Sequence, residues 1–180
     1  MHLRSVFLIS AVLIIWGCSH HGTATPRGTT PQNKTSKENK EQRSTMQLST
    51  YLLFDGDCQQ AMEFYRSVFG GDLALTTVGE SPMKNIFPVS MHSKVLNARL
   101  KSKMVDISAS DWLRPDEKRI QGNTVCLYLS GGTPDETTSI FRRLAESADE
   151  TDPISEQPFG LYGALNDKFG IRWMLHAEKL

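Results

Sequence analysis

The residues best suited to chemistry recur at every second position, near the C-terminus and again in the middle of the chain. Arg172, Met174 and His176 would share one face of a strand, as would Asn97 and Arg99. A guanidinium can hold an anion, and an imidazole can exchange a proton near neutral pH. A few such groups among apolar side chains predict a pocket for a small, partly apolar molecule.

Further candidates join this pocket through their places in or beside the expected strands. They complete the set of candidate ligand contacts: Thr50, Phe54, Asp111, Trp112 and Tyr162. If Thr50 faces the pocket, alternation along its strand places Phe54 there too. Plainer interpretations stay open, because His176 also fits a solvated side chain and Arg172 also fits a salt bridge at a rim. Tyr65 and Trp173 are predicted to lie in the core.

Cysteine is sparse, with one residue near the N-terminus, Cys18, and two farther along, Cys58 and Cys126. No Cys-x-x-Cys pair or Cys/His cluster predicts a zinc site. Cys58 falls at an expected helix start and Cys126 in an expected strand. Both are interpreted as small buried side chains, although pairing in an oxidising compartment stays open.

The charges are balanced overall but unevenly distributed. The chain has 20 basic and 20 acidic residues, and the stretch 19–45 contains no Leu, Ile, Val, Phe, Trp or Tyr. That stretch and the leader are basic, so the rest of the chain is mildly acidic. An acidic domain lacks the basic surface that neutralises phosphates, and we therefore expect no nucleic-acid partner.

The chain begins with a segment typical of exported proteins. Arg4 precedes an apolar run over 6–16, which is shorter than the roughly 20 residues that a membrane-spanning helix needs. The run leads into Ile-Trp-Gly ahead of Cys18, which resembles a lipobox, with Trp16 where a small residue is usual. The resemblance implies that Cys18 is lipidated and becomes the mature N-terminus. An uncleaved signal anchor and an ordinary secretory signal are the alternatives.

Three parts follow from these patterns. Residues 1–18 are predicted to be a lipoprotein signal peptide, 19–45 a flexible polar tether, and 46–180 a single folded domain. Ser19 stands where Asp would favour retention in the inner membrane. We therefore expect an envelope protein held by the Cys18 lipid, in the outer membrane facing the periplasm if the host is Gram-negative.

The folded part reads as two similar halves. In the first, strands are expected over 47–54, 72–78, 94–101 and 104–110, with a helix after Asp57 that Gln60 would help to cap and Gly70 would end. One face of this helix is apolar: Cys58, Ala61, Met62, Tyr65, Val68 and Phe69.

The second half repeats the order after a long loop over 111–122. Its strands are expected over 123–130, 153–156, 159–165 and 171–176, with a helix that Thr133 and Glu136 would cap around Pro134. Each half is thus βαβββ, and its single helix covers only one face of its strands. The other face, paired with the second half, would border a half-open cavity. The charged run over 116–119 is predicted to be a solvated loop that could close over a ligand.

Three segments carry a family resemblance. The opening YLLFDGDCQQAMEFYRSVFGG, the hairpin NARLKSKMVDISASD and the closing LYGALNDKFGIRWMLH resemble the PhnB-like branch of the vicinal-oxygen-chelate (glyoxalase/bleomycin-resistance/dioxygenase) superfamily, over about 47–177. The resemblance implies an α+β fold in which paired βαβββ modules form mixed curved sheets that enclose a cavity, with two main helices outside. It also makes a homodimer plausible, since relatives commonly dimerise.

The superfamily's enzymes hold a divalent metal with His, Gln or Glu on equivalent strands. The equivalent positions here are Thr50, Ile107 or Ser108, Asn123 or Thr124, and Met174. None is His or Glu, so we expect no metal and no cofactor. Asn97 stands where the branch often has His. Relatives are often labelled ubiquinone-type methyltransferases, but no glycine-rich strand-to-helix loop for a nucleoside cofactor is present.

Three functions remain after this comparison. The first is an exported, lipid-anchored protein that binds a small, partly apolar molecule without metal catalysis. The second is a glyoxalase- or dioxygenase-type metalloenzyme with displaced ligands, such as Asn97, Asp111 and His176. The third is an envelope interaction protein that dimerises through sheet edges.

Overall fold

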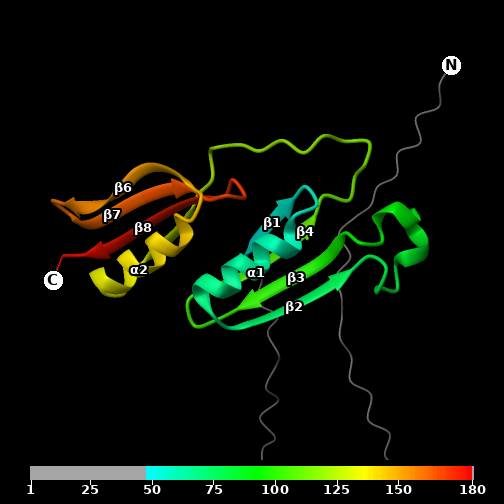
Figure 1. Ribbon diagram of the computed structural model, residues 1–180, viewed down its shortest axis with the longest axis horizontal. Coiled ribbons are helices and arrows are strands. Elements are labelled where there is room, and N and C mark those ends of the chain that lie inside the picture. Colours follow the sequence, from blue (N-terminus) through cyan, green and yellow to red (C-terminus); the bar gives the residue numbers. More distant parts are fainter. Residues whose placement is uncertain (1–47, 180) are drawn as a thin grey trace, which may run out of the picture. The chain divides into compact units, whose positions relative to one another are not determined.

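The computed structural model describes residues 48–179, which belong to one compact unit (Figure 1). The predicted signal peptide, the lipidation of Cys18 and the tether lie outside the described residues. Within 48–179, no helix is long and apolar enough to cross a membrane.

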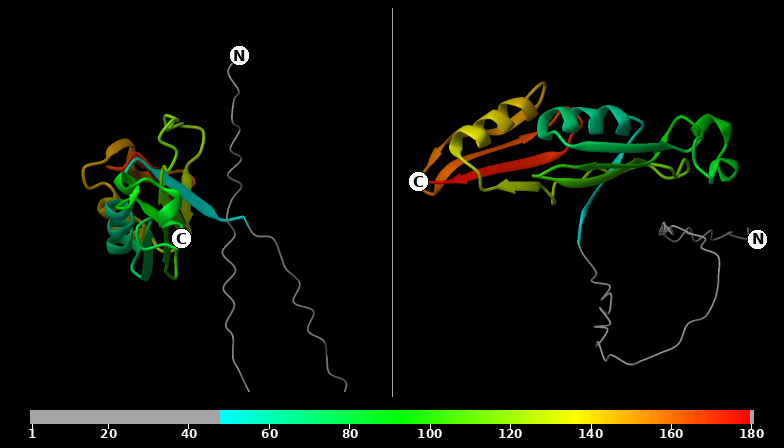
Figure 2. Two further views of the ribbon diagram at one scale, coloured as in Figure 1. Left: turned by 90° about the vertical axis from the view of Figure 1, so that its right-hand side faces the viewer. Right: turned by 90° about the horizontal axis from the view of Figure 1, so that it is seen from below.

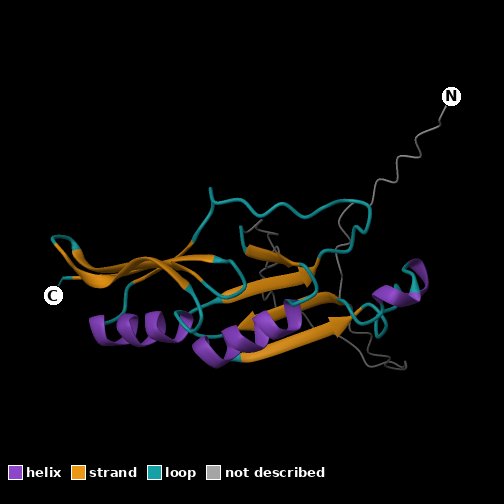
Figure 3. Ribbon diagram, turned by 45° about the horizontal axis from the view of Figure 1, so that its top comes forward, coloured by secondary structure: helices purple, strands orange, loops and turns teal. Residues whose placement is uncertain are grey.

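The βαβββ order occurs twice, as the sequence predicted. Module 1 consists of β1 (Thr50–Phe54), α1 (Cys58–Phe69), β2 (Asp72–Thr77), β3 (Val95–Lys101) and β4 (Asp106–Asp111). Module 2 consists of β5 (Leu127–Ser130), α2 (Pro134–Leu144), β6 (Asp149–Gln157), β7 (Gly160–Asn166) and β8 (Arg172–Glu178). The segment 112–126, called the connector below, joins them (Figure 3).

Each module forms one mixed four-stranded sheet. The strand order is β1-β4-β3-β2 in sheet A and β5-β8-β7-β6 in sheet B. In both sheets the first strand pairs in parallel with the last, and the other neighbours are antiparallel. Paired βαβββ modules with two main helices confirm the predicted fold class.

Two segments depart from the expected strand bounds. The strand expected over 123–130 starts only at Leu127, because its partner β8 starts at Arg172 and offers little to the residues before Leu127. The segment between β2 and β3, expected to be irregular, contains two short 3₁₀ turns, Lys84–Ile86 and Val89–Met91.

The structure confirms the cap predicted for the second helix and contradicts the cap predicted for the first. At α2 the predicted capping box is present: Glu136 N donates to Thr133 Oγ1 (3.2 Å) and Thr133 N donates to Glu136 Oε2 (2.9 Å). At α1 the Asp57 side chain caps nothing. Instead, Asp111 at the end of β4 accepts a hydrogen bond from Cys58 N (3.1 Å). Asp111 thus takes the capping role that was predicted for Asp57.

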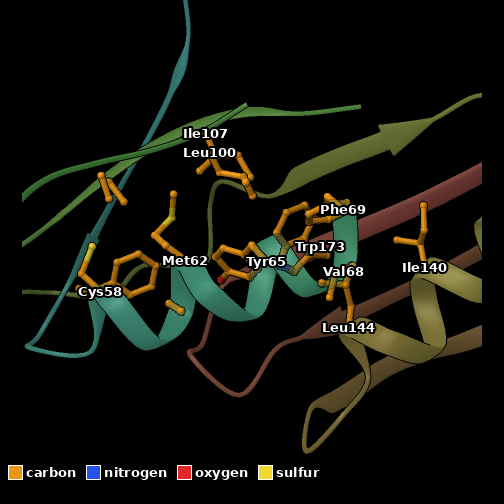
Figure 4. Close-up of a cluster of buried hydrophobic side chains, with 14 of the residues drawn as sticks. Cys58, Met62, Tyr65, Val68, Phe69, Leu100, Ile107, Ile140, Leu144 and Trp173 are labelled. Atoms are coloured by element: carbon orange, nitrogen blue, oxygen red, sulfur yellow. The ribbon is translucent and has the colours of Figure 1, made fainter. Parts of the chain in front are cut away.

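The apolar face predicted for α1 is buried in full, and it packs against both modules. Tyr65 and Phe69 lie against Trp173 of β8, with ring centroids 5.6 and 5.4 Å away (Figure 4). The predicted core positions of Tyr65 and Trp173 are confirmed. The modules therefore share one hydrophobic core, and α1 lies at its centre.

Asp167, in the turn between β7 and β8, fastens the two modules to each other. Its Oδ2 accepts from Tyr65 Oη of α1 (2.7 Å) and from Trp173 Nε1 (2.9 Å), and its Oδ1 accepts from the backbone N–H groups of Phe169 and Ile171. Burial, and next the charge of Asp167, raise the pKa of Tyr65, so the phenol keeps its proton and donates. This arrangement fixes module 2 on module 1 within a single chain.

The helices leave one face of each sheet uncovered. Figure 2 shows α1 and α2 on the same side of their sheets, so the two uncovered faces look the same way. We call them the open faces of sheets A and B. Within one chain these faces lie side by side and are not closed against each other. The candidate site must be sought there or in the hollows at their margins.

Candidate functional site

The register of β1 decides which of its side chains reach an open face. Thr50 pairs with Ile107, and Leu52 pairs with Ala109. Ile107 and Ala109 are buried in the helix-side core, so Thr50, Leu52 and Phe54 point to that side as well. The prediction that Phe54 lines the ligand pocket is wrong, because its side chain is only 2% exposed within the core. Thr50 borders only a small hollow of about 300 Å³ between β4 and β5.

The open face of sheet A therefore carries the odd-numbered residues of β1. Tyr51 and Leu53 are 53% and 39% exposed there. Asn97 and Arg99 share this face, as predicted from their spacing. Arg99 is already engaged, since its Nε and Nη2 donate to the two carboxylate oxygens of Asp106 (2.8 and 2.7 Å). These hydrogen bonds hold the pKa of Asp106 below its ordinary value.

The open face of sheet B holds most of the predicted contacts in one place. Met174 pairs with Tyr128 and with Ala164, while His176 pairs with Ser130 and with Tyr162. Trp173 and Leu175, which alternate with them, are buried in the core. Tyr162, Arg172, Met174 and His176 therefore share the open face of this sheet, as predicted.

An aromatic group gathers around His176 on this face. It consists of Tyr128, Phe159, Tyr162 and His176. Tyr128 stacks on the His176 ring (centroids 6.5 Å apart, 17° between planes), and Phe159 lies 5.8 Å from it. Phe159 also meets Tyr162 edge to face, and both Tyr128 and Phe159 are more than half exposed. A flat apolar surface that remains in water is a feature of binding sites.

Hydrogen bonds fix the orientation of the His176 ring. Nε2 lies 3.2 Å from the carbonyl oxygen of Phe159, and Nδ1 lies 3.1 Å from Tyr128 Oη. A carbonyl can only accept, so Nε2 carries the proton, and in the neutral ring Nδ1 accepts from the Tyr128 phenol. The phenol oxygen keeps lone pairs directed away from His176, and these can accept a hydrogen bond from a ligand.

Sulfur lies beside this group. Both cysteines of the described residues are free: Cys58 is buried and Cys126 is partly exposed. Cys126 Sγ lies 3.1 Å from Met174 Sδ, which places a thiol next to the predicted contact Met174. Cys58 begins α1 of module 1, whereas Cys126 is the last residue of the connector. Burial, and next the charges of Asp111 and Asp57, raise the pKa of the Cys58 thiol to about 12.

Asp111 was predicted to touch ligand, and its surroundings contradict this. It is only 2% exposed. Its Oδ1 accepts from Gly56 N (2.9 Å) and Cys58 N (3.1 Å), and its Oδ2 accepts from Val95 N (2.7 Å). This carboxylate ties the start of α1 and the start of β3 to the end of β4. Asp111 has a structural role because its side chain lies on the helix side of the sheet.

Trp112 follows Asp111 into the connector. Its indole Nε1 donates to the backbone oxygen of Glu117 (2.7 Å), and the Arg114 guanidinium lies 5.6 Å from the ring centroid. Together with Leu53 it borders a hollow of about 490 Å³. Trp112 thus orders the connector beside sheet A, away from the aromatic group of sheet B.

Three of the residues at the superfamily's metal positions, Thr50, Ile107 and Met174, do not suit a divalent ion. Thr50 and Ile107 point to the helix side, and Met174 offers a thioether, which is a poor ligand for hard or borderline cations. Within residues 48–179, no group of three or more His, Cys, Asp or Glu side chains is arranged to hold a metal ion. The displaced set Asn97, Asp111 and His176 does not converge either, because Asp111 lies in the core while the others lie on the open faces of different sheets.

The sequence also matches a known family through most of its length. The model of the family described as 3-demethylubiquinone-9 3-methyltransferase matches residues 46–176. The chain belongs to this family. Its glycine pairs show no nucleotide-binding loop, because Gly70 ends α1 and Gly132 precedes the capped start of α2.

Relatives agree with this membership. The protein YjdN of Escherichia coli (strain K12) is 27% identical over 145 residues, which is 74% of this chain and 97% of YjdN. The crystal structure of PA1353 from Pseudomonas aeruginosa is 28% identical with a TM-score of 0.67, covering 74% of this chain and 98% of PA1353. The fold is shared by a glyoxylase/bleomycin resistance protein/dioxygenase domain from Frankia sp. EAN1pec. That domain is 17% identical with a TM-score of 0.51, and the match covers 76% of this chain and 94% of the domain.

The motifs behind the family resemblance are structural in this chain. Asp111 closes the middle motif and holds module 1 together through three backbone N–H groups. Asp167 lies within the last motif and joins the modules through Tyr65 and Trp173. Both carboxylates are buried, with all their bonds directed into the protein. Membership of the family thus predicts the architecture of this chain.

Sequence reasoning missed three members of the sheet B surface: Tyr128, Phe159 and Cys126. Tyr128 and Cys126 alternate on a strand that was expected, so their spacing contained a usable signal. Phe159 lies just before β7, in the turn after β6, and reaches His176 only because the strand pairing folds it back. No local pattern marks that contact.

Proposed function

We propose that this chain binds a small, partly apolar molecule on the open face of sheet B, without a divalent metal. The observation that carries the proposal is the solvent-exposed aromatic group around His176, which shares its face of β8 with Met174 and Arg172. A flat apolar ligand would stack on Tyr128 and Phe159. A polar group of the ligand would meet the Tyr128 oxygen.

A thermal-shift screen of small aromatic compounds tests this proposal on the full chain. A compound that binds only the folded state raises the unfolding midpoint, and at a given concentration a tighter ligand raises it more. Tyr128→Ala should abolish the shift. Tyr51→Ala is the matched control, because Tyr51 is equally exposed on the open face of sheet A. Equal loss of binding in both variants would contradict a site on sheet B.

The place of action is a proposal of its own. The leader and Cys18 support an exported protein whose acylated cysteine anchors it to the bacterial envelope. Metabolic labelling with a radioactive fatty acid should mark the wild-type chain in the membrane fraction. Loss of label and release from the membrane in Cys18→Ala would support the anchor, and retention of both would refute it.

A second candidate function is favoured by the open faces themselves. Tyr51, Leu53, Tyr128 and Phe159 are large apolar side chains exposed on or beside two faces that look the same way. A second copy laid against these faces would cover them and close a cavity around the aromatic group. Sedimentation velocity should then show a dimer that Leu53→Glu dissociates. A monomer at all concentrations would exclude this arrangement.

A further inference from the structure

A polar hollow lies at the end of sheet B where β8 begins. Its volume is about 520 Å³. Six residues from two segments line it, and we call it the Arg172 pocket: Gln121, Gly122, Asn123, Asn166, Gly170 and Arg172. The connector forms one wall, and the turn between β7 and β8 forms the other.

The lining contains a cation and no anion. Arg172 makes no ion pair or side-chain hydrogen bond with any residue in 48–179. Asp167 is next to Asn166 in the sequence, but its oxygens accept from Tyr65, Trp173 and two backbone N–H groups on the core side. It therefore cannot supply Arg172 with a partner. A guanidinium stays charged at every physiological pH, so the pocket keeps a positive charge.

Side-chain amides supply further donors around this charge. Gln121 is held in place, because its Nε2 donates to the backbone oxygen of Gly170 and its Oε1 accepts from Arg119 (3.5 Å). Asn123 and Asn166 face the same hollow. Gly170 is favoured at this point because its φ is +79°, a conformation that residues with a Cβ rarely adopt. The bond from Gln121 to the Gly170 oxygen holds the two walls together.

The connector carries a second guanidinium, that of Arg119. Arg119 Nε is buried and has no hydrogen-bond partner among the described residues. Arg119 lines the neighbouring hollow near Trp112, which shares Gln121 and Gly122 with the Arg172 pocket. Two cationic side chains that line adjoining hollows favour a negatively charged occupant.

We propose that the Arg172 pocket binds the oxyanion group of the ligand, a carboxylate or a phosphate, while the apolar part of the ligand lies over the aromatic group. This extends the proposed function and rests on it. Arg172 would bind two oxygens side by side, and the amides of Asn123 and Asn166 would donate to the remaining lone pairs. Tyr128 pairs with Met174, which lies two residues, or roughly 7 Å, from Arg172 on the same face of β8, so one ligand can reach from Arg172 to the Tyr128 ring.

The first test separates the pocket from the aromatic group. Inorganic phosphate and acetate are titrated into the full ¹⁵N-labelled chain, and the side-chain amide signals of Asn123 and Asn166 are followed. The signals should move and saturate, and the anion with the lower Kd identifies the preferred oxyanion. Arg172→Gln should abolish the movement, whereas Arg142→Gln on the exposed face of α2 should leave it unchanged. Movement that persists in Arg172→Gln would overturn the proposal.

The second test adds the apolar part of the ligand. Binding of 2-naphthoate, 2-naphthyl phosphate and the neutral 2-naphthamide is compared. Arg172→Gln should weaken the better anion at least about tenfold and change the affinity for naphthamide less than twofold. Equal losses for anion and amide would refute the pocket but leave the proposed function intact. Naphthamide binding that survives Tyr128→Ala would instead refute the proposed function. An unchanged unfolding midpoint in Arg172→Gln shows that the variant is folded.

Discussion

Replacing Asp167 by alanine should loosen the attachment of module 2 to module 1. The substitution removes the acceptor of Tyr65 Oη (2.7 Å) and Trp173 Nε1 (2.9 Å), both of which are buried. A buried donor left without a partner costs about 1–3 kcal/mol, so the two together cost about 2–6 kcal/mol. The backbone N–H groups of Phe169 and Ile171 are part-buried and add less. The expected loss is a large share of the roughly 5–15 kcal/mol that stabilises an ordinary domain.

Urea unfolding followed by tryptophan fluorescence measures this loss through the transition midpoint and slope. A double-mutant cycle with Tyr65→Phe isolates the link between the modules. Tyr65→Phe alone should cost about 1 kcal/mol, because Asp167 keeps three donors. In the Asp167→Ala background it should cost less, since the hydroxyl it removes already lacks an acceptor. Asp72→Ala on the exposed edge is the control. A loss below about 1 kcal/mol for Asp167→Ala, or strict additivity in the cycle, would refute the role of Asp167 in joining the two modules.

Three further predictions concern other residues. Cys126 should react with a thiol reagent in the folded chain, whereas Cys58, with its pKa raised to about 12, should react only on unfolding; equal labelling of both by mass spectrometry would contradict this. Arg99→Ala should raise the pKa of Asp106 toward its ordinary value, as measured by NMR titration. Because this pKa is lowered in the folded chain, the Arg99–Asp106 pair stabilises the fold at pH values above the ordinary pKa of Asp. That stabilisation is lost as the pH falls through the lowered pKa. An unmoved pKa would mean that Arg99 does not bind Asp106 in solution. Gly170→Ala should destabilise by at least about 1 kcal/mol, given its φ of +79° and the adjacent Gln121; a neutral effect in urea unfolding would show that the turn relaxes.

Local patterns predicted the elements well because their causes are local. The apolar face of α1 follows from helical spacing, and the cap of α2 follows from Thr133 and Glu136 three residues apart. The cap of α1 failed for the opposite reason. Its acceptor, Asp111, is 53 residues from Cys58 and reaches the helix only through the parallel pairing of β1 with β4.

The sequence predicted the candidate site correctly only on strands whose alternating residues were assigned to the right face. Arg172, Met174 and His176 share the open face, as their spacing requires. On β1 the parity was wrong by one residue, so Thr50 and Phe54 point to the helix side while Tyr51 and Leu53 take the open face. A shift of one position exchanges the two faces of a strand, and the sequence of β1 is too evenly apolar to reveal which is buried.

The most direct test of the central claim follows the aromatic group itself during ligand binding. The ring signals of His176, Tyr128 and Tyr162 are recorded by ¹H–¹³C NMR while 2-naphthamide is added to the full chain. A site on the open face of sheet B predicts that these signals move together and saturate at one Kd, with Tyr51 unchanged. Movement at Tyr51 alone, or no saturable movement on sheet B, would contradict it.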